Sequence, residues 1–180
     1  MISIASRFRG PPESGNGGYT AGVLASRMPG CTEVTLRLPP PLERSLSISE
    51  TPHGLELRDD ETLIAEARPA RLELAIPVCP SFERASRLSE SYVGHQKHHF
   101  PGCFVCGPGR AAGDGLRIFP GAEQEHTLVA APWIADADLA DESGVVRPEF
   151  VWAALDCSGY FACAAPEYPV ALLGRITTNV

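Results

Sequence analysis

Hydrophobic and polar positions alternate with a period of two along several short stretches of the first half of the chain. These stretches are residues 33–38, 45–49, 54–58, 63–67 and 71–76. Such alternation is typical of strands that are buried on one face. Residues 19–28 form instead a compact apolar run, with Asn16 as a possible helix cap before it and Pro29 and Gly30 after it. The pattern predicts one helix followed by a meander of antiparallel strands, which is an α+β unit.

The second half repeats this pattern with fewer strands. A helix is expected over residues 148–164, where Pro148 suits the first turn. Strands are expected at residues 115–119, 126–131 and 170–180. The region between the halves lacks periodicity, so we divide the chain into residues 1–80, a linker at 81–102 and a second unit at 103–180. A unit that matched the first would continue with further strands, so either the chain is a fragment or another chain completes the second unit. We favour a fragment, with the second unit truncated.

The charge and composition of the chain limit the classes of partner that it is expected to bind. The formal net charge is -7, which argues against nucleic acid because phosphate binding needs a basic face. Lys97 is the single lysine among the 15 basic residues, and arginine suits phosphate groups such as those of coenzyme A. The sequence shows neither a signal peptide nor a membrane span. We therefore expect a cytoplasmic protein whose six cysteines are reduced.

Three segments resemble those of the thioesterase-like double-hotdog proteins, which are relatives of the acyl-CoA thioesterases. Residues 10–19 are similar to the glycine-rich entry into the central helix of that family. Residues 103–117 contain a Cys-x-x-Cys-Gly and then a Gly-Leu pattern, and residues 153–156 are similar to the helix segment that carries the catalytic acid. The resemblance implies a double hotdog, in which an antiparallel sheet wraps around a central helix in each half. It also implies thioester hydrolysis without a cofactor, and a homo-oligomer.

The same resemblance implies one composite active site. In simpler members of the family, a His-Gly-Gly motif starts the helix and an acid follows about two turns later. Here Asn16, Gly17 and Gly18 match that motif, but Ala25 stands at the position of the acid. In the second half Asp156 matches the acid, whereas the matching motif is absent. Each half therefore keeps what the other lacks.

Thioester hydrolysis needs donors for the oxyanion and a group that activates water. The backbone N–H groups of Gly17 and Gly18, at the positive end of a helix, suit the oxyanion. Asn16 is expected to cap the helix or to contact the substrate carbonyl. Asp156 is expected to be the general base or the nucleophile. In the alternative interpretation the glycines are a simple turn and Asp156 is a structural hydrogen-bond acceptor.

Neighbouring side chains are expected to bind the substrate or to orient the water. These are Tyr19, Trp152, Ser158, Thr177 and Thr178. The main rival function is a non-catalytic module that binds an acyl group or CoA, or that serves in assembly. A dehydratase on the same fold calls for a histidine close to an acid, and the spacing around His126 indicates none.

The Cys103-x-x-Cys106 motif, with His95, His98 and His99 upstream, offers half of a zinc site. A second cysteine pair is missing, so we assign no metal. Cys157 and Cys163 lie on the expected helix and are interpreted as small core residues.

Overall fold

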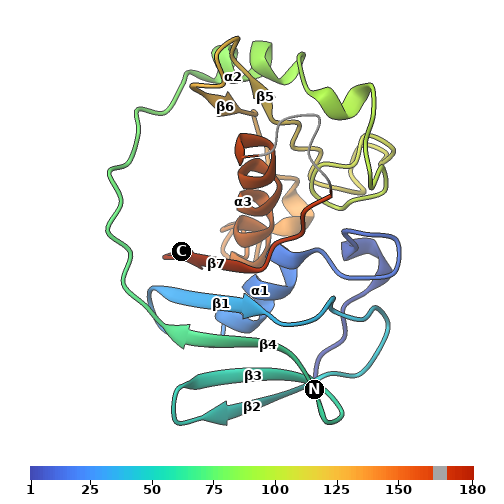
Figure 1. Cartoon of the computed structure of the whole chain (residues 1–180), viewed down its shortest axis with the longest axis vertical. Coiled ribbons are helices and arrows are strands. Elements are labelled where there is room, and N and C mark those ends of the chain that lie inside the picture. The colour runs from blue at the N-terminus through green and yellow to red at the C-terminus, as the bar shows by residue number, and fades with distance from the viewer. Residues whose placement is uncertain (164–169) are drawn as a thin grey trace.

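Five antiparallel strands form the main sheet of the protein, in the order β2-β3-β4-β1-β7 (Figure 1). The computed structural model describes residues 1–163 and 170–180. The strands are β1 (Thr32–Leu36), β2 (Ser47–Thr51), β3 (Gly54–Asp59), β4 (Thr62–Pro69) and β7 (Arg175–Thr178). The expected α+β class is therefore confirmed.

Helix α1 (Gly17–Ala25) packs against β1 and β4 of this sheet. It begins where Asn16 caps it, since the Oδ1 of Asn16 accepts a hydrogen bond from the N–H of Tyr19 at 2.8 Å. The helix starts two residues earlier than predicted, and it also ends three residues earlier than predicted. A turn through Met28 follows, in which the N–H of Met28 donates to the carbonyl of Ala25.

Helix α3 (Pro148–Cys163) lies antiparallel against α1, because Gly18 meets residues 152–156 whereas Gly22 meets residues 149–152. The prediction of this helix is confirmed up to Cys163, and its last predicted residue, Ala164, lies outside the described residues. The chain then returns to the first sheet, where β7 pairs antiparallel with β1 and Ile176 lies opposite Val34.

Several predicted strands are shorter than expected or absent. Residues 71–76 are exposed and carry no strand, because β4 ends at Pro69 and no other strand lies beside them in the described part of the chain. Residues 115–119 are irregular, although Leu116 and Ile118 donate backbone hydrogen bonds to Phe104 and Val105. Of residues 126–131, the structure has β6 (Val129–Ala130), which pairs with β5 (Gly121–Ala122). The last strand is reduced to β7.

The expected linker contains a helix. Helix α2 (Phe82–Ser89) is capped by Ser81, whose hydroxyl accepts from the N–H of Arg84. The one-turn helix η2 (Val93–His95) follows, and two further short helices are η1 (Ser6–Phe8) and η3 (Ala137–Leu139). Residues 71–79, all exposed, form the long arch that connects β4 to this region (Figure 1).

An aromatic cluster in the core joins the N-terminal segment and α1 to the Cys-x-x-Cys loop and α3. Phe8 stacks on Tyr19 with ring centroids 4.1 Å apart, and Phe104 and Phe150 pack against both rings. The cluster fixes α1 against α3 and against the loop of the Cys-x-x-Cys motif. Among the described helices, none combines the length and the apolar character that crossing a bilayer requires.

Candidate functional site

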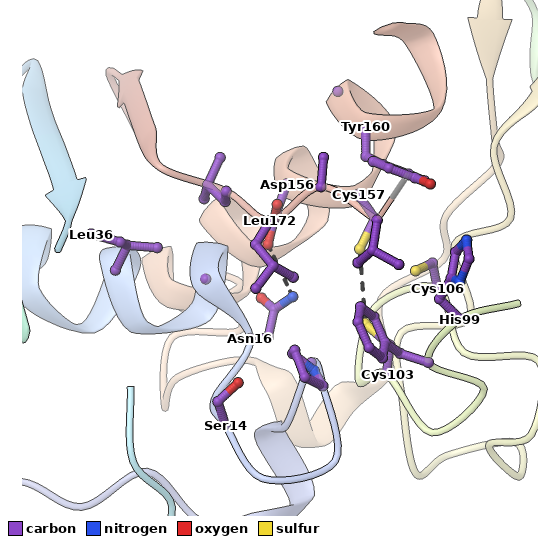
Figure 2. Close-up of a pocket in the computed structure, with 18 of the residues that line it drawn as sticks. Ser14, Asn16, Leu36, His99, Cys103, Cys106, Asp156, Cys157, Tyr160 and Leu172 are labelled. Atoms are coloured by element: carbon purple, nitrogen blue, oxygen red, sulfur yellow. Dashed lines mark hydrogen bonds between the residues drawn. The ribbon is translucent and has the colours of Figure 1, made fainter. Parts of the chain in front are cut away.

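The start of α1 meets the middle of α3 at Asp156 (Figure 2). The Nδ2 of Asn16 donates to Asp156 Oδ2 at 3.0 Å, and the backbone N–H of Gly18 donates to the same oxygen at 2.9 Å. The structure thus brings together Asn16, Gly18 and Asp156, which the sequence analysis had assigned to one site from opposite ends of the chain.

The cap of α1 determines which of its backbone donors remain free. The first N–H groups of a helix have no partner within the helix. Here Gly18 donates to Asp156, Tyr19 donates to the side chain of Asn16, and Thr20 donates to the carbonyl of Asn16. Among the described residues, the N–H of Gly17 has no acceptor. Gly17 is therefore the donor that is open to a ligand, whereas the N–H of Gly18 is already engaged.

Gly18 is required by the contact between the two helices. A Cβ atom at this position would lie 2.6 Å from the carbonyl oxygen of Trp152 and 2.7 Å from the Cβ of Asp156. Neither atom has room to move, because one is backbone and the other is fixed to the helix. The close approach allows the N–H of Gly18 to reach the carboxylate.

Burial raises the pKa of Asp156 to about 6, and the hydrogen bond from Gly18 opposes this shift most strongly. A smaller increase comes from Cys103, and a smaller decrease from Asn16. Both hydrogen bonds go to Oδ2. The other oxygen, Oδ1, has no partner among the described residues and is not shut off from solvent.

Asp156 lies on the wall of a cavity of about 1080 Å³. This volume is slightly above the range for small-molecule sites, which is roughly 300–1,000 Å³. Its wall includes Asn16 and Gly17 of the α1 cap, Leu36 of β1, and Leu155 and Tyr160 of α3. Residues 170–176 complete one side, with Leu172 and Leu173 among them. The cavity is thus a mainly apolar space, with several polar side chains on its wall, beside a half-buried carboxylate.

The side chains expected to bind substrate do not line this cavity. Tyr19 and Trp152 are buried in the core. The hydroxyl of Ser158 donates to the carbonyl of Ala154, and that of Thr177 donates to Glu33. Thr178 is buried in β7.

The sequence analysis missed the apolar residues that form the cavity wall. Leu155 and Tyr160 flank Asp156 on α3, and helical spacing from Asp156 was the available signal for Tyr160 at the i+4 position. The sequence predicts a strand over Leu172 and Leu173, and their pattern does not indicate that they line a cavity.

The structure also gathers three cysteines at one end of the cavity. Cys157 of α3 lies beside Cys103 and Cys106, and all three are buried. Cys157 is thus buried as expected, but Cys163 is exposed, so its assignment to the core is wrong. Hydrogen bonds from Cys106 and Cys157 hold the pKa of the Cys103 thiol well below its usual range, while Cys103 in turn raises the pKa of the other two.

Comparison of this chain with protein-family models, with curated proteins and with solved structures gave no match.

Proposed function

We propose that this protein hydrolyses acyl-CoA or a related thioester, at a site formed by Asp156, Asn16 and the start of α1. One observation carries the proposal: the carboxylate of Asp156 is held by Asn16 and by the N–H of Gly18 at the wall of a large apolar cavity. An oriented carboxylate can activate water, N–H groups at a helix start can stabilise the oxyanion, and an apolar space can hold the acyl chain.

We also propose a double-hotdog arrangement as the finer description of the fold. Strand β1 follows α1 in the chain and β7 follows α3. The two helices pack antiparallel, and the two strands pair antiparallel, with Thr32 opposite Thr178. Antiparallel pairing of equivalent elements is what a local two-fold axis produces, as in a dimer of like units. This relation supports two similar units that share one interface.

In the proposed reaction, Asp156 acts as general base. Its Oδ2 is fixed by Asn16 and Gly18, so that Oδ1 is left to take a proton from a water molecule. The water oxygen attacks the thioester carbon, and the N–H of Gly17 donates to the oxyanion that forms. The carbon–sulfur bond then breaks, and the proton on Asp156 passes to the leaving thiolate.

The cavity wall also bears on the choice of substrate. Arg37, Lys97 and Arg175 lie along it, and cations of this kind suit the phosphates of coenzyme A. The leucines of the wall suit the acyl chain. We retain a cytoplasmic location and assembly into homo-oligomers as parts of the proposal.

The test is the release of thiol from a panel of acyl-CoAs of varied chain length, with Asp156→Asn compared with the unaltered protein. Loss of a general base typically costs 10²–10⁴-fold, so we expect kcat to fall by about 100-fold or more. Asp136→Asn makes the same chemical change on an exposed loop and serves as control. Blanks without substrate correct for the exposed thiols of Cys79 and Cys163. If Asp156→Asn keeps full turnover, the assignment of the acid is wrong.

One observation favours a second candidate, a non-catalytic module that binds an acyl group or CoA. Two of the donors near the helix start, Asn16 Nδ2 and the N–H of Gly18, are already taken by Asp156. Calorimetry with acyl-CoA, followed by analysis of the products, distinguishes the two functions. Heat of binding with intact acyl-CoA recovered afterwards supports the module, whereas free CoA and fatty acid support the enzyme.

A further inference from the structure

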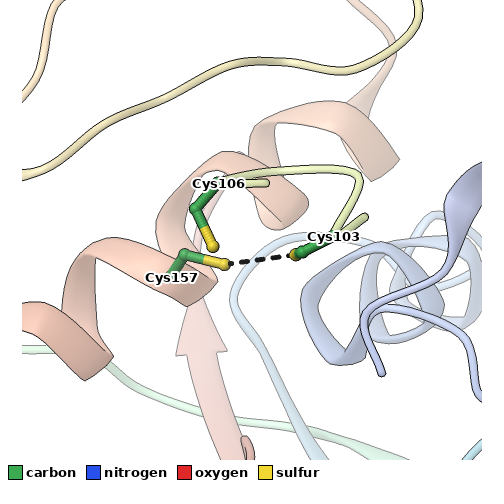
Figure 3. Close-up of side chains that lie close together, drawn as sticks. All are labelled: Cys103, Cys106 and Cys157. Carbon is green, nitrogen blue, oxygen red and sulfur yellow. Dashed lines mark hydrogen bonds between the residues drawn. The ribbon is translucent and has the colours of Figure 1, made fainter. Parts of the chain in front are cut away.

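Three cysteine sulfurs from distant parts of the chain converge in the core (Figure 3). Cys103 and Cys106 lie on one loop and Cys157 lies on α3. Their Sγ atoms all lie within 4.8 Å of one another, and the Sγ atoms of Cys103 and Cys157 are 3.9 Å apart. All three side chains are buried.

The distance between the Sγ atoms of Cys103 and Cys157 is close to that of two sulfurs bound to one tetrahedral ion. Zinc–sulfur bonds of about 2.3 Å place two sulfurs about 3.8 Å apart at the tetrahedral angle. A disulfide needs about 2.05 Å, and all three cysteines are free. The separation of Cys103 from Cys157 is therefore close to that of two zinc ligands.

The loop is shaped to present its two sulfurs. It turns tightly at Gly107, whose N–H donates to the carbonyl of Cys103 at 3.0 Å. A Cβ at Gly107 would lie 2.5 Å from that same carbonyl oxygen, so the turn requires glycine. The turn thus brings the two loop sulfurs close together beside Cys157.

Histidine provides the fourth ligand of a closed site. The Nε2 of His98 lies 3.4 Å from the Sγ of Cys106, and a sulfur and a nitrogen on one zinc are separated by about 3.5 Å. The Nδ1 of His98 accepts a hydrogen bond from the N–H of Phe100 at 2.9 Å, which places the ring proton of the neutral form on Nε2. Nε2 lies more than 4.8 Å from at least one of the other two sulfurs, so coordination through Nε2 requires the ring to move, with its proton transferred to Nδ1 and the contact with Phe100 broken.

We propose that Cys103, Cys106 and Cys157 bind one zinc ion, with His98 as the fourth ligand. A divalent cation allows all three sulfurs to ionise together in the core, with release of protons to solvent. The ion joins the Cys-x-x-Cys loop to α3 at the residue that follows Asp156. This proposal does not depend on the proposed hydrolysis, and its tests do not use turnover.

The direct test is the metal content of the protein purified under reducing conditions with zinc in the medium. We expect one zinc ion per chain. Cys157→Ser is expected to lower zinc occupancy at least tenfold after dialysis against a weak chelator. Cys79→Ser and Cys163→Ser change exposed thiols and are expected to retain the ion. Occupancy in Cys157→Ser equal to that of the unaltered protein would overturn the assignment.

A second measurement needs no variant and so does not depend on whether Cys157→Ser folds. The unaltered protein is stripped of metal under reducing conditions and titrated with Co²⁺. We expect intense thiolate-to-cobalt charge-transfer absorption and the visible bands of tetrahedral Co²⁺, both saturating at one equivalent. Saturation without charge-transfer absorption, or a disulfide among these three cysteines in the protein as purified without reductant, would contradict the proposal.

His98→Ala tests the fourth position separately, with His99→Ala as the matched neighbour. We expect His98→Ala to weaken Co²⁺ binding at least tenfold and to shift the visible bands, because a nitrogen ligand is replaced by water. His99→Ala is expected to leave both unchanged. Identical spectra and affinities in the two variants would remove His98 from the ligand set.

Discussion

Asn16 makes hydrogen bonds with both ends of its amide, one within α1 and one to α3. Its Oδ1 accepts from Tyr19 and caps α1, while its Nδ2 donates to Asp156. Aspartate would cap the helix equally well but would place a second negative charge against the carboxylate. Serine would cap as well, but its short side chain would not span the same distance to α3. The identity of this residue therefore follows from the pair of contacts.

Tyr19 gives a prediction at the same scale. Burial in the aromatic cluster raises its pKa to about 12, from the ordinary value of 10. A raised pKa in the folded state stabilises the fold below pH 10, and this stability is lost as the pH rises from 10 towards 12. Two pKa units correspond to about 3 kcal/mol. Urea unfolding from pH 8 to 12 should show this loss relative to Tyr19→Phe, which has no phenol to ionise. Parallel curves for the two proteins would show that the phenol is freely ionised in the folded state.

At the scale of elements, the contact between α1 and α3 depends on small residues. A Cβ at Gly22 would lie 2.6 Å from the Cα of Glu149 and 2.8 Å from the Cβ of Trp152. Overpacking of this kind typically costs roughly 1–3 kcal/mol, while alanine in place of glycine in a helix gains up to about 1 kcal/mol. We expect Gly22→Ala to lower the free energy of unfolding by about 1–2 kcal/mol.

Gly159→Ala is the matched control, because a Cβ at Gly159 in α3 meets nothing within 4 Å. It should raise the stability by about 0.5–1 kcal/mol through helix propensity alone. Chemical denaturation of the three proteins compares the two changes directly. Stabilisation by both substitutions would mean that the two helices are further apart than the structure places them.

The sequence predicted helices better than strands for a physical reason. A start signal followed by an apolar run determines a helix locally: Asn16 caps α1, and Pro148 is the first residue of α3. A strand also needs a neighbour, and alternation does not identify one. Residues 71–76 alternate as regularly as those of β4, yet they lie exposed without a partner in the described structure. Helix α2 was missed, although Ser81 is a good cap and Phe82, Ala85 and Leu88 recur at helical spacing, because its eight residues are mostly polar and lie in a stretch interpreted as a linker.

At the scale of the whole molecule, the site is formed by contacts between segments that are far apart in the sequence. Only those contacts that the family resemblance implied could be predicted. The resemblance to double-hotdog proteins predicted that residues 16–18 and Asp156 belong together, and they are in hydrogen-bond contact. Nothing comparable joined Cys157 to the Cys-x-x-Cys motif, because their proximity depends on how α3 rotates against the loop. The walls of the cavity were missed for the same reason, since residues 170–176 approach the start of α1 through the pairing of β7 with β1.

The exposed segment that follows β4 gives a last prediction. Residues 71–79 are exposed and lack helix or strand, and segments of this kind are preferred sites of proteolysis. Trypsin should therefore cleave early after Arg71, whereas Arg68 is protected by the Pro69 that follows it.

The two fragments should stay together after this cleavage, because their contacts do not involve the arch. The pairing of β1 with β7, the packing of α1 on α3, and the hydrogen bond from Phe104 N–H to Arg9 O all join residues before the cleavage to residues after it. Size-exclusion chromatography of the nicked protein should give one peak with both fragments, which separate only in denaturant. Arg71→Gln should slow the first cleavage. Fragments that elute apart in native buffer would show that the shared sheet and the helix pair do not hold the two halves together.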